Sequence, residues 1–241
     1  ININENINTT SGGMNGDILL KAASDITFAK AKTTSSSGGD MIFWSDADGN
    51  SAGDIFFEAD QNTSYTNPVT ISTGGGHLWL GGGSGTTTWN GLTVGNSYAV
   101  GNTARAVGGS FTHNNGIMIQ STSINTSGGH IRMRGMGKSG NYSHPSYSGG
   151  MYLVGSGTMN SGGGNIDIEA IAQSGNDGNY GLYNLGTYVF APGAGDLTIF
   201  GDASASSASF GSNAVGNGVL LWSGAISSTG NIHISGKKSS A

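Results

Sequence analysis

The sequence contains no cysteine and few charged residues, and each of these two features excludes a class of function. Without cysteine there is neither a disulfide framework nor thiol catalysis. Charged residues make up 10% of the chain and the formal net charge is −5, so no basic patch stands out for phosphate groups and we expect no nucleic-acid partner. No apolar run approaches the ~18 residues of a membrane helix, so we expect no insertion into a membrane.

Glycine is abundant by contrast, with 45 of the 241 residues, whereas hydrophobic residues make up 35%. We therefore expect no thick globular core. The first residues, ININENINTT, lack the basic and apolar regions of a signal peptide. Because the chain begins with Ile and its repeating pattern reaches both ends, we expect it to be a segment of a longer protein.

A short pattern recurs along the chain: Gly, then Asp, Asn or His, then an apolar residue, any residue and a second apolar residue. Its alternating apolar positions predict a short strand with one face turned inward. Gly adopts positive φ without strain, and Asn, Asp and His are also enriched there, so we expect the first two residues to form a left-handed corner. The instances begin at Gly16, Gly39, Gly53, Gly76, Gly129, Gly164, Gly195 and Gly230.

A companion strand pattern precedes this one in the second half of the chain. It begins at Gly116, Gly150, Gly181 and Gly218, at intervals of 34, 31 and 37 residues, and one further apolar position lies between the two patterns. Strands of about three residues are too short for a sandwich, but they suffice as coil faces that pair with the same face above and below. We predict an all-β fold, a right-handed parallel β-helix or β-solenoid, with recurrent long loops at one corner.

We expect residues 1–241 to form a single β-solenoid segment. The pattern is irregular before Gly116, so residues 81–115 hold either an insertion or a degenerate coil. Whether each period forms one coil with a loop or two thin coils stays open at this stage. A β-propeller is the less favoured fold, because its blades need four strands of ordinary length.

Three strings carry a resemblance to a known family: INTSGGHIRMRG (124–135), NSGGGNIDIEA (160–170) and SSTGNIHISGK (227–237). They resemble the repeats of filamentous-haemagglutinin-like and β-strand-repeat adhesins, which are very large bacterial surface proteins. The resemblance covers most of the chain. It implies an extracellular location at the bacterial cell surface, a β-helical rod, a role in adhesion, gliding or matrix building, and no catalytic residues. The long excursion in each unit departs from the family's shorter coil.

Oxygen-bearing side chains alternate in the stretch DADGNSAGD (46–54). Asp46, Asp48, Asn50 and Asp54 have the ligand types and spacing that suit a hard cation such as calcium. The stretch departs from an EF-hand loop, because Phe57 stands where the final Glu would be, and Asp54 already fits the corner pattern. A polar turn without a cofactor is the favoured interpretation, and a structural calcium at these four residues is the alternative.

The second residues of the corners form a column that has the residue types of a metal or catalytic array. Successive corners place only one such residue on each coil, so we interpret the column as a ladder or a set of left-handed corners. Its expected members are Asp17, Asp40, Asp54, His77, His130, Asn165, Asp196 and Asn231.

Catalytic motifs are scarce. GMGKSG (135–140) contains the Gly-Lys-Ser of a phosphate-binding loop, but Arg132 stands where the first Gly should be. A β-helical lyase or hydrolase would need clustered acidic and basic residues on adjacent coils, and the chain has only 9 Lys and Arg. We expect no enzymatic activity.

Aromatic side chains in the loops are candidate binding residues. Tyr142, His144 and Tyr147 lie in one loop and Tyr180 in the next, where they can contact a glycan or a neighbouring chain. The alternative is that they fold back to cover the coil. Ile42, Phe56 and Trp79 form an apolar outer stripe, which needs a cover from residues 81–115 or from another chain.

Neither end of the chain resembles a polar cap, and exposed strand edges pair with other chains. We therefore expect flanking repeats, or copies of the chain stacked head to tail or laterally, with cell-surface glycan as a further partner. The expected function is a structural and adhesive extracellular segment, a stiff rod or fibre for attachment or matrix. The alternative is a carbohydrate-binding or carbohydrate-active β-helix protein.

Overall fold

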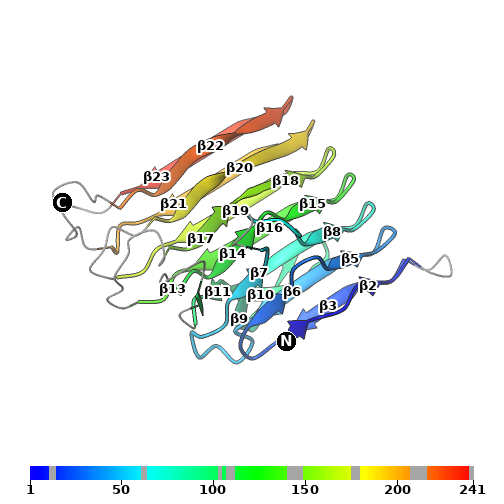
Figure 1. The fold of residues 1–241 in the computed structure, drawn as a ribbon, viewed down its shortest axis with the longest axis horizontal. Coiled ribbons are helices and arrows are strands. Elements are labelled where there is room, and N and C mark those ends of the chain that lie inside the picture. Colours follow the sequence, from blue (N-terminus) through cyan, green and yellow to red (C-terminus); the bar gives the residue numbers. More distant parts are fainter. Residues whose placement is uncertain are drawn as a thin grey trace.

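The computed structural model describes residues 1–10, 15–60, 64–102, 105–106, 112–139, 149–174, 180–206 and 216–238. In these residues the protein is all β and contains no helix, and its parallel strands stack as a β-solenoid (Figure 1). The prediction of a parallel β-helix is confirmed. Each coil contributes one stretch of strand to each of three faces.

The three faces are ladders of parallel strands. Face 1 consists of β1 (Asn2–Ile3), β4 (Ile26–Phe28), β7 (Ile55–Phe57), β14 (Ile117–Gln120), β17 (Met151–Val154) and the first parts of β20 (Leu182–Gly193) and β22 (Val219–Ser228). Face 2 consists of β2 (Ile7–Asn8), β5 (Thr33–Ser35), β8 (Thr70–Ser72), β15 (Ser123–Asn125), β18 (Ser156–Asn160) and the second parts of β20 and β22. Face 3 consists of β3 (Ile18–Lys21), β6 (Met41–Ser45), β9 (Leu78–Trp89), β16 (Ile131–Met136), β19 (Ile166–Ile171), β21 (Leu197–Asp202) and β23 (Ile232–Lys237).

The pairing register settles how many coils one period makes. Ile117 pairs with Met151, Met151 with Leu182, and Leu182 with Val219, each one period further along the chain. One period is therefore one coil. The recurrent long connections β16–β17, β19–β20 and β21–β22 run from face 3 to face 1, which confirms the recurrent loops at one corner. One further long connection, from β7 to β8, runs from face 1 to face 2.

One instance of the repeating pattern was assigned to the wrong face. Gly53 and Asp54 precede β7, which pairs with β4 and β14 on face 1. The other instances precede strands of face 3. Asp54 is therefore not a member of the corner column that Asp40 and His77 share.

The prediction of left-handed corner glycines is also wrong. Positive φ occurs one residue earlier, for example at Gly128 (φ +115°), whereas Gly129 is not among the residues with positive φ. A Cβ on Gly129 would lie 1.9 Å from the carbonyl oxygen of Gly76 in the adjacent coil. The corner requires Gly because neighbouring backbones approach too closely for a side chain. Similar clashes with the adjacent coil's corner would occur at Gly39, Gly76, Gly164, Gly195 and Gly230.

The core is the narrow space between the faces, filled by alternate side chains of each strand. Phe28 and Phe57 stack on face 1 with ring centroids 4.7 Å apart, and Phe43 of face 3 tilts against Phe28 at 4.8 Å. Further along face 1, Ile119 and Leu153 continue the same column. Apolar burial at about 25 cal/mol per Å² holds the coils together.

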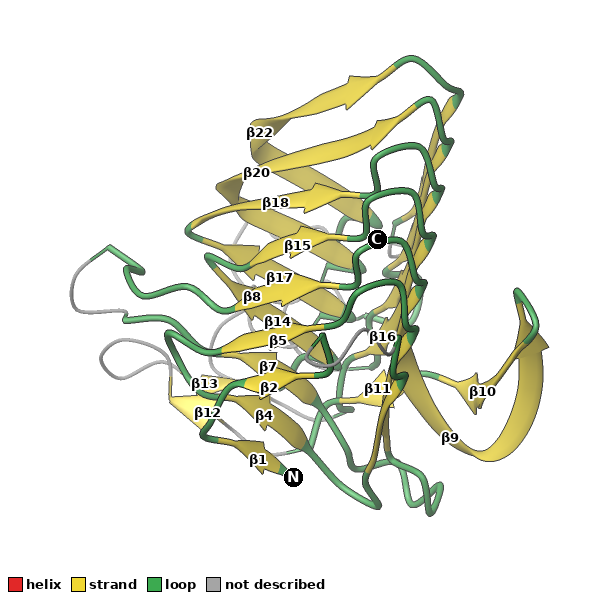
Figure 2. Cartoon of the chain, turned by 90° about the vertical axis from the view of Figure 1, so that its right-hand side faces the viewer, coloured by secondary structure: helices red, strands yellow, loops and turns green. Residues whose placement is uncertain are grey.

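After Gly82, which still pairs with Ser45 on face 3, the described residues up to 113 form an excursion from the regular coil. β9 continues past face 3, turns at Asn90 and Gly91, and returns antiparallel as β10 (Leu92–Ser97) (Figure 2). β11 (Ala99–Val100) then pairs with β16, and β12 (Arg105–Ala106) pairs with β13 (Thr112–His113). This stretch is an insertion built on a hairpin.

The hairpin covers the outer stripe of face 3. Trp79 is only 1% exposed and clusters with Trp44 and Val94, and Ile42 and Trp89 pack against them. The cover therefore comes from the chain itself. Phe56 is not part of this stripe, because it lies on face 1.

Candidate functional site

The stretch from Asp46 to Asp54 is a compact turn between β6 and β7. Asp46 is 4% exposed with φ +48°, and its Oδ1 accepts a hydrogen bond from the backbone N–H of Ala52 at 3.1 Å. Asp48 accepts from the backbone N–H of Asn50 at 3.3 Å and from its Nδ2 at 2.8 Å. These contacts organise the loop through its own backbone.

The structure does not assemble the four predicted calcium ligands into one group. Asp54 is buried, and its backbone N–H donates to Oδ1 of Asp25 at 3.1 Å. Burial raises the pKa of Asp46, and the nearby Asp48 carboxylate raises it further. Among the described residues, no group of three or more His, Cys, Asp or Glu side chains is placed to hold a metal ion. Calcium binding here stays a prediction.

The corner column of face 3 is a continuous hydrogen-bonded ladder. Oδ1 of Asp17 accepts the backbone N–H of Asp40 at 2.8 Å, and Oδ1 of Asp40 accepts that of His77 at 2.6 Å. The same contact repeats at every later step, with distances of 2.9, 2.9, 3.0 and 2.9 Å, through His130, Asn165, Asp196 and Asn231.

This geometry explains why Asp, Asn and His exchange at one position. Oδ1 of Asp and Asn and Nδ1 of His are all acceptor atoms bonded to Cγ, so each reaches the same backbone N–H. The ladder interpretation is confirmed. These residues satisfy backbone donors and do not surround a common point.

The two histidines of the ladder are held in one tautomer. Nδ1 of His77 accepts from the N–H of His130 at 2.9 Å, and Nδ1 of His130 accepts from Asn165 at 2.9 Å, so in each neutral ring the proton is on Nε2. The rings stack with centroids 5.0 Å apart, and Trp89 lies edge-on to His77 at 5.7 Å. Burial, and then the neighbouring His77, lowers the pKa of His130.

A buried hydroxyl column runs beside the ladder and was missed in the sequence. Oγ of Ser36 donates to the carbonyl oxygens of Gly39 at 2.7 Å and Thr73 at 2.9 Å. Thr73, Thr126 and Ser161 make the same bond to the corner Gly three residues later. That constant spacing is the signal that could have identified the column.

Of the predicted loop aromatics, Tyr142, His144 and Tyr147 lie outside the described residues. Tyr180 stacks on Tyr183 with centroids 4.7 Å apart, and Tyr183 stacks on Tyr152 at 5.4 Å. Tyr152 and Tyr183 belong to the outward column of face 1, which the sequence analysis did not single out. Burial raises the pKa of Tyr180.

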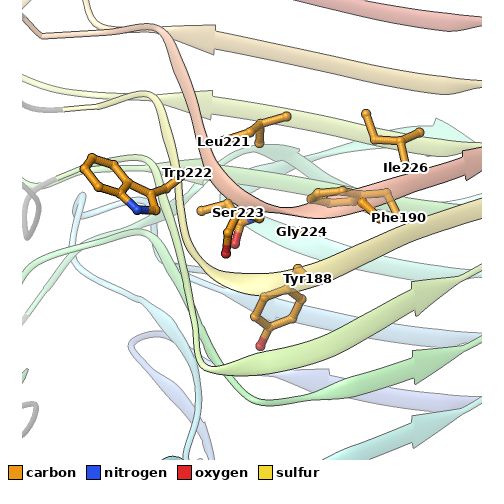
Figure 3. Close-up of a pocket in the computed structure, with 9 residues that line it drawn as sticks. Tyr188, Phe190, Leu221, Trp222, Ser223, Gly224 and Ile226 are labelled. Atoms are coloured by element: carbon orange, nitrogen blue, oxygen red, sulfur yellow. The ribbon is translucent and has the colours of Figure 1, made fainter.

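The core is exposed at the β22–β23 end of the stack. Ile232 and Ile234 pair with the fully buried Leu197 and Ile199, yet they are 51% and 40% exposed. Trp222, on β22, is 70% exposed. A cavity opens between β20 and β22 at the same end (Figure 3).

The chain matches no protein-family model, no curated protein and no solved structure. In the described part of the chain, no helix has the length and apolar character that a membrane span requires.

Proposed function

We propose that the chain is a structural and adhesive segment of an extracellular bacterial β-helix, a stiff rod that presents loops to a surface and joins copies of itself into a fibre. The observation that carries this proposal is the unbroken corner ladder from Asp17 to Asn231. A side-chain bond at each step, added to the backbone pairing of three faces, makes bending and sliding between coils costly.

The exposed β22–β23 end of the stack supports the proposal that the chain binds a partner with the same repeat. Ile232 and Ile234 present apolar surface, and Asn231 continues the ladder to the last strand. At the other end, Asp17 and Ile18 begin the same pattern. Head-to-tail stacking would let the N–H of Asp17 in one copy donate to Oδ1 of Asn231 in the next, as at every internal step.

A charge placed in the end surface tests this proposal. Ile234→Asp puts a carboxylate into the apolar end, whereas His233→Asp puts one on the outward side of the same strand, where His233 pairs with Thr198. Sedimentation velocity over a concentration series should show large assemblies for the native chain and for His233→Asp, and single chains for Ile234→Asp. Single native chains at every concentration would contradict head-to-tail assembly.

A second candidate function is glycan binding, and the stacked Tyr180, Tyr183 and Tyr152 favour it. Aromatic rings beside polar loops are a common platform for sugars. Tyr180→Ala, which removes the outermost ring of the stack, should abolish binding on a glycan array, while Tyr98→Ala on the outside of face 3 should not. Release of sugar products during incubation would instead support a carbohydrate-active enzyme.

A further inference from the structure

A small recess lies part-way along the stack, where the tip of the β9–β10 hairpin meets the outside of face 3. It has a volume of about 110 Å³ and is lined by Trp89, Asn90, His130, Ile131, Asn165 and Asp167. Its rim is open to solvent, because Asn90 and Asn165 are exposed. The recess is not a product of the chain's ends, since β16 pairs with β9 and β19, and β19 pairs onward with β21.

The hairpin tip supplies an aromatic wall. Trp89 pairs with Leu92 across a tight turn in which Asn90 and Gly91 have φ of +46° and +80°. The indole lies edge-on to His77 at 5.7 Å and packs against the apolar cluster beneath the hairpin, yet it stays partly exposed. A ring that is already held in place presents apolar surface to a ligand at little cost in conformational entropy.

The corner ladder determines which atoms the floor of the recess offers. Nδ1 of His130 accepts the N–H of Asn165 at 2.9 Å, so the neutral ring carries its proton on Nε2, which is a donor. Oδ1 of Asn165 accepts the N–H of Asp196 at 3.0 Å, so this side chain has the hydrogens of Nδ2 to offer a ligand. The ladder thus presents two side chains of the recess as hydrogen-bond donors.

Asp167 adds an acceptor that a ligand can reach. Its side chain is 39% exposed, and its Oδ2 lies 3.3 Å from Nε of Arg132. Burial raises the pKa of Asp167, and the Arg132 guanidinium opposes that rise. A carboxylate oxygen accepts strongly from a hydroxyl. The floor therefore combines one charged acceptor with two neutral donors beside an indole.

This combination selects a class of ligand. A hydroxyl group both donates and accepts, so one placed between His130 and Asp167 satisfies both side chains. A cation would face the donor hydrogens of His130 and Asn165, and an anion would face the Asp167 carboxylate. A neutral pyranose ring has adjacent hydroxyls on its rim and an apolar C–H face that suits an aromatic side chain.

We propose that this recess binds one neutral sugar residue of a glycan, with its C–H face against Trp89 and adjacent hydroxyls bonded to His130 and Asp167. The site goes beyond the proposed function, because it involves neither the ends of the rod nor the Tyr180 stack. A site for one ring should bind a free monosaccharide weakly, with a dissociation constant of about 1 mM.

NMR titration of the native chain tests the proposal. The probes are the methyl pyranosides of glucose, galactose, mannose and N-acetylglucosamine, and the reporter is the indole N–H resonance of Trp89, which is identified by its loss in Trp89→Phe. At least one probe should give a saturable shift. Cyclohexanol, a ring of the same size with a single hydroxyl, should bind roughly tenfold or more weakly than that probe. No saturable shift with any of the four sugars, or equal binding of cyclohexanol, would overturn the proposal.

Asn165→Asp tests the donors without breaking the ladder. Asp fits the ladder, as Asp196 does at the next step, but it replaces the Nδ2 donors by a second carboxylate beside Asp167. Affinity for the sugar should fall roughly tenfold or more. Asp196→Asn makes the opposite exchange one step along the ladder, outside the recess, and should bind as the native chain does. Unchanged affinity in Asn165→Asp, or an equal loss in Asp196→Asn, would overturn the assignment.

Trp89→Ala tests the aromatic wall by ligand-observed NMR. It should weaken binding roughly tenfold or more, whereas Trp222→Ala, which removes the 70% exposed indole of β22, should not. If Trp89→Ala does not fold, Asn165→Asp decides. Tyr180→Ala separates this site from the glycan binding considered above and should leave the affinity unchanged. Loss of sugar binding in Tyr180→Ala with retention in Trp89→Ala would place the sugar at the tyrosine stack and overturn the proposal.

Discussion

The backbone N–H of His130 donates to Nδ1 of His77 at 2.9 Å, and the N–H of His77 donates to Oδ1 of Asp40 at 2.6 Å. An imidazole thus replaces a carboxylate in the ladder without a change of geometry. Only the neutral ring can do so, because protonation places a hydrogen on Nδ1, which then faces the N–H that it should accept. The step in which Nδ1 of His130 accepts the N–H of Asn165 is therefore sensitive to pH.

We predict that the protein loses stability in mild acid. Burial and His77 hold the pKa of His130 below its usual 6.5. The unfolded chain therefore binds this proton more readily than the folded chain, so the contribution is complete above about pH 6.5 and is lost as the pH falls from there towards the lowered folded pKa. His130→Asn keeps an acceptor on Cγ but does not titrate, and should flatten the decline. Urea denaturation between about pH 7 and pH 5 measures this decline in the free energy of unfolding. If the free energy falls with the same slope in His130→Asn, the ladder is not the cause of the decline.

Close approach and backbone conformation make different demands on glycine, and two alanine variants separate them. Gly129→Ala places a Cβ 1.9 Å from the Gly76 carbonyl oxygen and should destabilise the protein by more than about 3 kcal/mol. Gly163→Ala has open space but φ +121°, and should cost about 1–2 kcal/mol. Urea midpoints give the comparison. Equal costs would mean that contact between coils does not determine the corner.

The hydroxyl of Tyr188 satisfies a backbone donor inside the core. Tyr188→Phe leaves the N–H of Thr122 without its acceptor and should cost roughly 1–3 kcal/mol. Tyr98→Phe is a control at the outer surface of face 3, where the hydroxyl bonds to Glu169 and the ring lies 4.2 Å from the Arg134 guanidinium. It should cost less than about 1 kcal/mol. Similar losses in thermal denaturation would argue against a special role for the buried hydroxyl.

If residues Asp46 to Asp54 form only a polar turn, calcium should not change the thermal stability of the protein. Thermal denaturation in excess calcium and in a chelator should give the same midpoint, because backbone groups already occupy Oδ1 of Asp46 and Oδ1 of Asp48. Specific binding at a hundredfold excess over the dissociation constant would stabilise the fold by about 2.7 kcal/mol. A calcium-dependent midpoint that disappears in Asp48→Asn would establish the metal site instead.

The fold could be predicted because its signal is local and repeated. Alternating apolar residues after a Gly-Asx pair define an inward face, and the companion pattern at Gly116, Gly150, Gly181 and Gly218 fixes the period. The same pattern does not indicate to which of the three faces its strand belongs. Gly53 and Asp54 were therefore assigned to face 3, although they precede a strand of face 1.

The remaining features depend on contacts between coils. The close approach of Gly129 to Gly76 joins residues 53 apart in the chain and is invisible within one repeat. Asn184 stands in the sequence at an apolar position of its strand pattern, but its unpaired oxygen appears only when the neighbouring strand is in place. Of the tyrosine stack, the sequence predicted only Tyr180 as a candidate binding residue. Tyr152 and Tyr183 are outward positions of face 1, and the side chains that pack against such positions come from other parts of the chain.

Electron microscopy of the purified native chain, with layer-line analysis, tests the central claim that this solenoid extends through its ends into a rod. The account predicts long fibres with strands perpendicular to the axis and an axial repeat of about 4.8 Å between strands, lost in Ile234→Asp and kept in His233→Asp. Separate short particles in the native sample, under conditions where the fold is intact, would contradict it.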